Sequence, residues 1–155
     1  MSTDFLRHSI ATLAYRGGKA VRDVPSGFSS FSAAPGSRTA GEILAHVGDL
    51  LDWGLSIAKG EQKWEPRAPQ DWAADVARFH EGLAALDAYL ASGAPLGEQP
   101  EKIFQGPIAD ALTHVGQIAY LRRLAGAPVK GENYFRAEIS IGRVTADQAK
   151  PVREF

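Results

Sequence analysis

Apolar residues recur every three or four positions in four separate stretches of the chain, which is the period of an amphipathic helix. These stretches span residues 3–22, 39–59, 71–91 and 106–126. The second begins with a predicted capping box formed by Thr39 and Glu42. The fourth is expected to begin near Gly106 or Pro107, because proline is favoured in the first turn of a helix. The pattern therefore predicts an all-α protein built as a four-helix bundle.

The connections between these helices differ in length and composition. Residues 23–38 are rich in Pro, Gly and Ser and predict a long crossover loop at one end of the bundle, anchored by Phe28 and Phe31. A loop of this length means that the first two helices need not be antiparallel neighbours. Residues 60–70 form a polar, proline-containing linker, and several Gly and Pro residues between 93 and 100 separate the third and fourth helices.

The last 29 residues, 127–155, do not continue the helical pattern. Weak alternation around Ile139 and Ile141 predicts either a short strand or an extended strap. Tyr134, Phe135 and Phe155 argue against full disorder, because disordered segments are poor in aromatic residues. We expect residues 1–126 to form the bundle and residues 127–155 to pack on the same domain as a C-terminal strap.

Composition excludes several functional classes. The chain of 155 residues carries 17 basic and 18 acidic side chains, a net charge of −1, which gives no electrostatic reason to expect binding to nucleic acid or a membrane. The absence of cysteine excludes disulfides, thiolate metal sites and a cysteine nucleophile. Since no stretch resembles a signal peptide or a membrane span, we expect a cytoplasmic protein.

Two of the four histidines share the tripeptide His-Val-Gly, at His46 and His114. Residues four and seven positions apart lie on one side of a helix. On this spacing His46 belongs to an otherwise apolar stripe, and His114 lies between Asp110 and Gln117. The stripe that includes His46 is formed by Ile43, Leu50, Trp53 and Ile57.

If the second and fourth helices face each other, His46, Asp110 and His114 can bind one divalent metal. Three protein ligands that leave coordination positions open are typical of catalytic sites, and this set suits iron(II) as well as zinc. The alternative is structural. His46 is then a polar core residue, and Asp110 is a surface partner of His114 that the helix dipole favours in the first turn.

Other polar residues near these positions are candidates for supporting roles. Gln117 could orient a ligand, and Asp49 could accept a hydrogen bond from a ligand imidazole, although a solvated charge is the simpler interpretation of Asp49. Glu42 is the nearest candidate for a general base, but its capping role already explains it. His8 and His80 are expected at the surface or at its boundary.

At these residues the chain resembles the DinB-like family of bacterial metal-binding four-helix bundles. The resemblance covers about residues 3–126 and rests on LAHVGDLLDW and on D-x-x-x-H-V-G-Q-I. It implies a metal site formed by His46, residue 110 and His114, frequent homodimerisation and, in some relatives, reactions with a low-molecular-weight thiol. Asp110 stands where the family usually has histidine, and a carboxylate remains a suitable ligand for Zn, Ni, Mn or Fe.

Three hypotheses about function follow. The first is a metal-dependent hydrolase or thiol S-transferase acting on a small molecule. The second is a non-catalytic bundle with a vestigial metal site that binds a small apolar ligand or a protein, as the three tryptophans Trp53, Trp64 and Trp72 and the C-terminal strap suggest. In the third, the strap closes the cleft and brings Glu132, Asn133 or Tyr134 to the site; alternatively it only covers apolar surface or a dimer partner.

Overall fold

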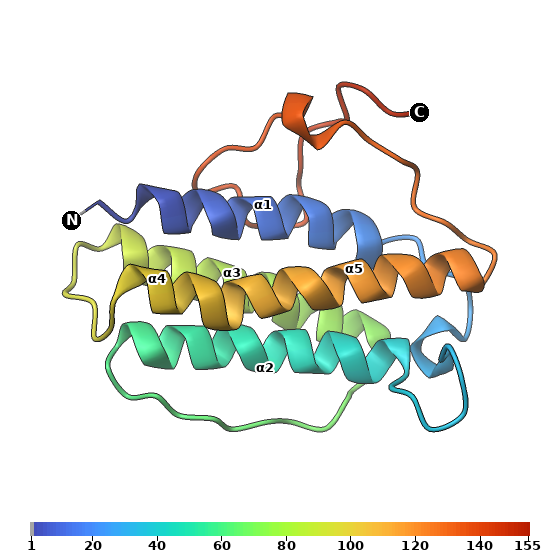
Figure 1. Cartoon of the computed structure of the whole chain (residues 1–155), viewed down its shortest axis with the longest axis horizontal. Helices are drawn as coiled ribbons and strands as arrows, with labels where there is room; N and C mark the ends of the chain where they lie inside the picture. Colours follow the sequence, from blue (N-terminus) through green and yellow to red (C-terminus); the bar gives the residue numbers. More distant parts are fainter. Residues whose placement is uncertain (1) are drawn as a thin grey trace.

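A computed structural model describes residues 2–155, which form an all-helical bundle (Figure 1). The long helices are α1 (Asp4–Val21), α2 (Ala40–Ala58), α3 (Trp72–Ala91) and α5 (Ala109–Leu124). Short helical turns are η1 (Phe28–Ser30), α4 (Pro100–Ile103), η2 (Phe104–Ile108) and η3 (Tyr134–Arg136). Within the described residues no helix has both the length and the apolar character needed to cross a bilayer.

The helices do not follow one another around the bundle in sequence order. Both α1 and α2 pack against α3 and α5, so α1 and α2 lie diagonally opposite each other. In Figure 1, α1 and α5 run in one direction and α2 and α3 run in the other. The loop between α1 and α2 crosses one end of the bundle, as the sequence predicted, and the buried Phe28 anchors it. This arrangement places α2 directly beside α5.

The predicted start of the fourth helix was wrong. The helix begins at Pro100, and Pro107 lies inside it within the π-helical turn η2. Proline in a helix interior lacks the N–H donor and crowds the preceding turn, and a π turn accommodates this locally. Asp110 therefore lies well inside a continuous helix rather than at a free N-terminus. The helix dipole does not account for an acidic residue at this position.

Glycines allow close contacts between the helices in the core. A Cβ atom on Gly17 of α1 would lie 2.5 Å from Cζ of Phe79, which is fully buried on α3. A Cβ on Gly82 of α3 would lie 2.9 Å from Cβ of Leu51 on α2. Because real Cβ atoms do not approach so closely, a larger residue at either position would push α3 away from its neighbours.

The linker between α2 and α3 runs the length of the bundle, because these two helices point in the same direction (Figure 1). Residues 61–70 are exposed. The backbone N–H of Arg67 donates to Oδ1 of Asp49 at 3.0 Å, and that of Gln70 donates to Oδ2 of Asp75 at 2.9 Å. The guanidinium of Arg78 on α3 also binds Asp49, at 2.7 Å. Asp49 thus holds the linker beside α2, and Asp75 holds its end at the start of α3.

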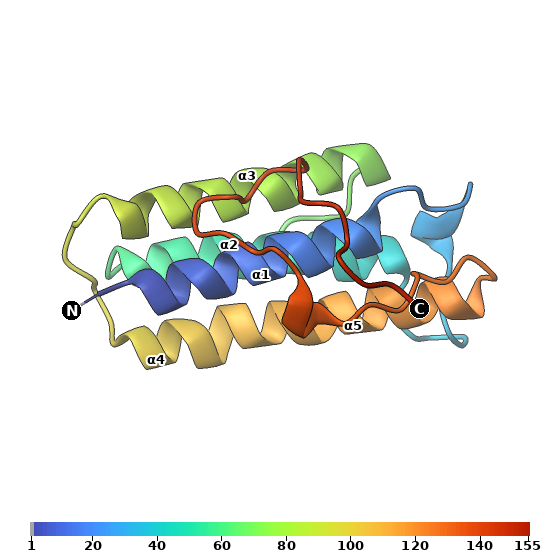
Figure 2. The same cartoon turned by 90° about the horizontal axis from the view of Figure 1, so that it is seen from above.

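The C-terminal segment forms an extended strap over α1 (Figure 2). No strand forms around Ile139 and Ile141; the only regular pairing in the described part of the strap is an isolated bridge between Glu132 and Glu154. The side chain of Glu132 is fully buried, where it accepts hydrogen bonds from Tyr15 and Lys19 of α1. The strap is thus fastened to α1 by a charged, hydrogen-bonded network.

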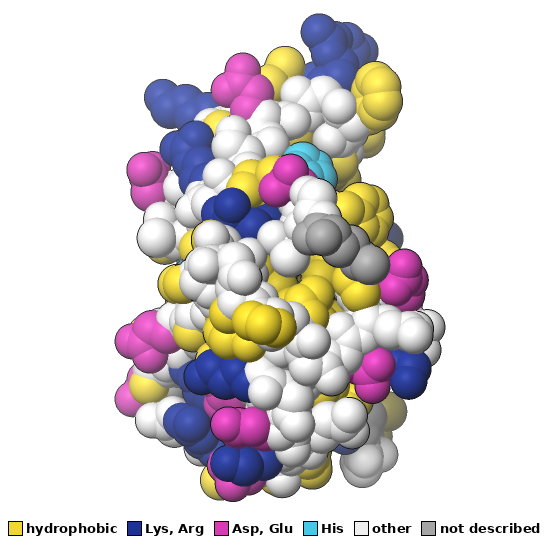
Figure 3. Space-filling model, turned by 90° about the vertical axis from the view of Figure 1, so that its left-hand side faces the viewer, with side chains coloured by type: hydrophobic (Ala, Val, Ile, Leu, Met, Phe, Trp, Pro, Cys, Tyr) yellow, Lys and Arg dark blue, Asp and Glu magenta, His cyan; other side chains and the backbone are white. Residues whose placement is uncertain are grey.

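Charged side chains are spread over the end of the bundle at which α1 begins (Figure 3). Hydrophobic side chains are visible near the centre of this face, and acidic and basic groups are interspersed around them. This mixture fits the near-neutral net charge of the chain.

Candidate metal centre

The structure brings His46, Asp110 and His114 together where α2 packs against α5. One ligand atom from each residue lies within 4.8 Å of the others. Nε2 of His114 lies 3.4 Å from Oδ1 of Asp110, and Nε2 of His46 lies 3.7 Å from Oδ2 of the same carboxylate. The two imidazole rings are 4.7 Å apart and nearly perpendicular. We call these three residues the triad.

The triad is not explained by direct hydrogen bonds among its members. Both nitrogen–oxygen separations exceed the usual length of an N–H···O hydrogen bond, about 2.7–3.2 Å. Each separation runs to a different oxygen of the Asp110 carboxylate, so the carboxylate lies between the two imidazoles. The Asp110 side chain is 47% exposed and can rotate to adjust these distances. The donor set and its spacing fit a divalent metal, so this group could hold one.

A neighbouring amide fixes the orientation of the His114 ring. Nδ1 of His114 and Oε1 of Gln117 are 2.8 Å apart. When Nδ1 donates its hydrogen to this carbonyl oxygen, Nε2, the atom that faces Asp110, carries the lone pair of the neutral tautomer. Hydrogen bonds of this kind orient metal-binding histidines in known sites. This contact places Gln117 beside His114, and its supporting role at a metal site stays a prediction.

Tryptophans shield His46, whose side chain is 20% exposed. The ring of Trp64, on the linker, lies 5.7 Å from that of His46, and Trp53 of α2 lies 5.8 Å from Trp64. Burial lowers the pKa of His46, and the electrostatic influence of His114 and Arg38 lowers it further, against the opposing effects of Asp110 and Asp49. The lower pKa favours the neutral imidazole, which is the form that binds metals.

Two hollows border the triad on either side. The first, of about 590 Å³, lies over α5 and includes His114; we call it the α5 hollow. The second, of about 660 Å³, lies under the linker and includes His46 and Trp64; we call it the linker hollow. Arg38, which directly precedes α2, lines both. Because His114 lines the α5 hollow, a small molecule bound there would lie beside the triad.

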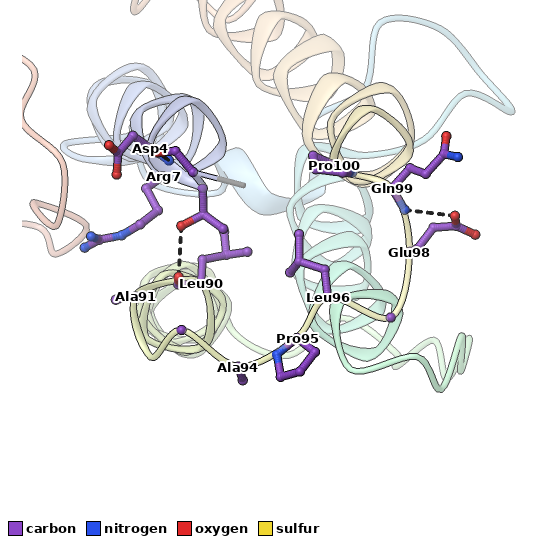
Figure 4. Close-up of a pocket in the computed structure, with 14 residues that line it drawn as sticks. Asp4, Arg7, Leu90, Ala91, Ala94, Pro95, Leu96, Glu98, Gln99 and Pro100 are labelled. Atoms are coloured by element: carbon purple, nitrogen blue, oxygen red, sulfur yellow. Dashed lines mark hydrogen bonds between the residues drawn. The ribbon is translucent and has the colours of Figure 1, made fainter.

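A larger hollow of about 780 Å³ lies at the end of the bundle between α1, α3 and the start of α4 (Figure 4). Its polar groups are mostly paired: Arg7 binds Asp87 of α3, and the Glu98 carboxylate accepts a hydrogen bond from the Gln99 backbone. Its lining holds no histidine, and none of its residues belongs to the triad. Size alone therefore does not make this hollow the functional site.

Two of the acidic residues considered from the sequence have structural roles. Glu42 closes the capping box with Thr39, as predicted: its carboxylate accepts from the Thr39 backbone at 2.8 Å. Asp49 is neither a solvated charge nor a partner of a ligand imidazole, because it is buried and paired with Arg78. Its position on α2 did not reveal this pairing, because Arg78 comes from α3.

The histidines outside the triad lie elsewhere. His8 is exposed, and His80 is partly buried with Nδ1 at 3.4 Å from the carbonyl oxygen of Val144 in the strap. Both positions agree with the sequence prediction. Trp72 donates to the carbonyl of Val21 at 3.0 Å and packs on Phe28, so only two of the three tryptophans lie near the triad.

The strap does not close over the triad in this structure. Glu132 is committed to Tyr15 and Lys19, the ring of Tyr134 packs on Arg16, and the Asn133 side chain caps η3. The alternative in which one of these residues faces the site is not what the structure shows, because α1 provides the partners of Glu132 and Tyr134 and Asn133 caps η3.

Sequence reasoning did not consider Arg38, and it named Trp64 only as a possible ligand-binding aromatic residue, not as a neighbour of His46. Both lie in loops, where helical spacing gives no information about direction. The composition around Trp64 predicted a polar linker, but only the parallel course of α2 and α3 places that linker beside His46.

Comparisons with known proteins gave no relative of this chain: no protein-family model, no curated protein and no solved structure matches it at a significant level. Conclusions about function therefore rest on the triad and its surroundings.

Proposed function

We propose that the protein binds one divalent metal through His46, Asp110 and His114 and acts as a metal-dependent hydrolase or thiol S-transferase on a small molecule. The observation that carries this proposal is the convergence of three ligand atoms within 4.8 Å, at separations too long for hydrogen bonds. Zn, Ni, Mn and Fe all accept this ligand set, and the carboxylate shifts preference toward the harder ions.

Membership of the DinB-like family is part of the same proposal. It is supported by the two motifs around His46 and His114 and by the all-helical bundle, and the comparisons add no support. Homodimerisation is likewise inferred from the resemblance. Phe135 and Phe155, which are 98% and 76% exposed, provide apolar surface for such contacts. Analytical ultracentrifugation would test the dimer directly.

When bound, the ion would supply Lewis-acid chemistry that lowers the pKa of a water molecule or a thiol. The chain's own residues would hold the ion, orient His114 through Gln117 and limit access of water to His46 through Trp53 and Trp64. Glu42 and Asp49, which line the same hollow as His46, are engaged in the capping box and with Arg78. This favours reactions in which the ion itself activates the nucleophile, without a separate carboxylate base.

Metal analysis combined with thermal unfolding tests the proposal. We expect about one ion per chain and, at one hundred times the dissociation constant, an added stability of about 2.7 kcal/mol. For a chain of this length that corresponds to a rise in Tm of roughly 5–11 °C. Asp110→Ala should lose most of the rise, and Glu101→Ala, a change at an exposed acid on the adjoining α4, should keep it. Unchanged melting with all four metals would refute the proposal.

The second candidate function is a non-catalytic module that binds an apolar ligand. The α5 hollow supports it, since Ile43, Tyr120 and Leu121 contribute to its lining. In that case a ligand would bind equally well to the metal-treated and the chelator-treated protein, and the Asp110→Ala variant would bind it as the unaltered chain does.

A further inference from the structure

The α5 hollow has an uneven distribution of charge. Among the described residues that line it, Arg38 is the only Lys or Arg, and none is Asp or Glu. The linker hollow on the other side of Arg38 contains both Glu42 and Asp49. Arg38 is exposed and, like several other arginines, forms no ion pair within the described residues. The guanidinium is thus free to bind an anion.

Gly116 of α5 lines the α5 hollow. A Cβ atom there would meet no heavy atom within 4 Å, so packing does not require glycine at this position. Glycine inside a helix costs about 1 kcal/mol relative to alanine. One turn further along α5, Tyr120 is more than half exposed and lines the same hollow. Gly116, which lowers the stability of the helix, therefore lies between His114 of the triad and the exposed ring of Tyr120.

We propose that the α5 hollow binds a small molecule that has an apolar body and a carboxylate or similar anionic group, with the anion on Arg38 and the body over Gly116 and Tyr120. A guanidinium binds a carboxylate through two parallel hydrogen bonds, which fixes orientation as well as position. This inference names the class of substrate for the proposed metal site. It depends on the proposed function in one respect only, the placement of the reacting part of the molecule beside His114.

Isothermal titration with 4-phenylbutanoate and its neutral amide, 4-phenylbutanamide, tests this inference on chelator-treated protein. We expect the acid to bind about tenfold more tightly than the amide, because a charged hydrogen bond adds to the shared apolar contact. Arg38→Gln should reduce this ratio to about twofold or less by removing the charge. Arg123→Gln, at an exposed arginine of α5 outside the hollow, should preserve it.

Changes at Gly116 test the location. Gly116→Leu should weaken binding of both probes about tenfold by filling the hollow, and Gly116→Ala should weaken it less while stabilising the helix. Equal affinity of the acid and the amide for the unaltered chain, an unchanged ratio in Arg38→Gln, or full binding by Gly116→Leu would each overturn the inference.

Zinc titrations of the same preparations separate this inference from the proposed function. Zinc binding without a preference for the acid would refute the anion site alone. A preference for the acid without zinc binding would refute the metal site alone.

Discussion

The contact between the strap and α1 predicts which side chains hold the C-terminal segment in place. Glu132 accepts hydrogen bonds from Tyr15 and from Lys19, whose Nζ also lies 3.0 Å from Glu154. The side chains of Lys19 and Glu132 are 7% and 0% exposed, so water does not replace a lost partner. Burial by itself lowers the pKa of Lys19, but the hydrogen bonds to both carboxylates outweigh it and raise the pKa overall.

Glu132→Ala should therefore destabilise the fold substantially. Removing one partner of a buried ion pair costs about 3–5 kcal/mol, because the other charge stays buried. Glu154 remains beside Lys19, so we expect a loss of about 3 kcal/mol, or roughly 6–12 °C in Tm. Urea unfolding followed by circular dichroism measures this loss. Glu138→Ala, at an exposed glutamate of the same strap, is the control and should change stability by no more than about 0.5 kcal/mol.

A double mutant shows whether the buried charge is the cause. Adding Lys19→Met to Glu132→Ala removes the uncompensated ammonium group, so the double mutant should recover part of the lost stability rather than lose more. If Glu132→Ala cost less than about 1 kcal/mol, water or alternative partners would be satisfying Lys19, and the network would not be what holds the strap. Additive losses in the double mutant would contradict the same reasoning.

Two further predictions concern the histidines. Gln117→Leu should weaken metal binding about 10–100-fold by releasing the tautomer and orientation of His114; isothermal titration with zinc measures this, and an unchanged dissociation constant would exclude the orienting role. Burial lowers the pKa of His80. The His80 imidazole therefore binds a proton at a higher pH in the unfolded chain than in the folded chain. Folding stability should fall as the pH drops below about 6.5. His80→Gln should reduce this fall in urea unfolding at pH 7.5 and 5.5; an equal fall in both chains would assign it to other groups such as His46, whose pKa is also lowered.

Local sequence determined the helices and the faces they bury. Their apolar period predicted α1, α2 and α3 closely, because each needs only one apolar stripe and local end signals. The Thr39–Glu42 capping box was predicted because its two partners are three residues apart. The relation of Asp110 to His114 also followed from the helix alone, since residues four apart on a helix are neighbours.

Only the tertiary structure decided which helices meet and what the intervening segments contact. His46 lies beside His114 because α2 packs against α5, and neither sequence segment contains that information. The burial of Asp49 depends on Arg78 from α3, and the role of Glu132 depends on Tyr15 and Lys19 from α1. Trp64 reaches His46 because parallel helices force the linker along the bundle. Helical periodicity fixes the direction of a side chain relative to its own helix, whereas a contact between distant segments depends on the packing of the whole chain.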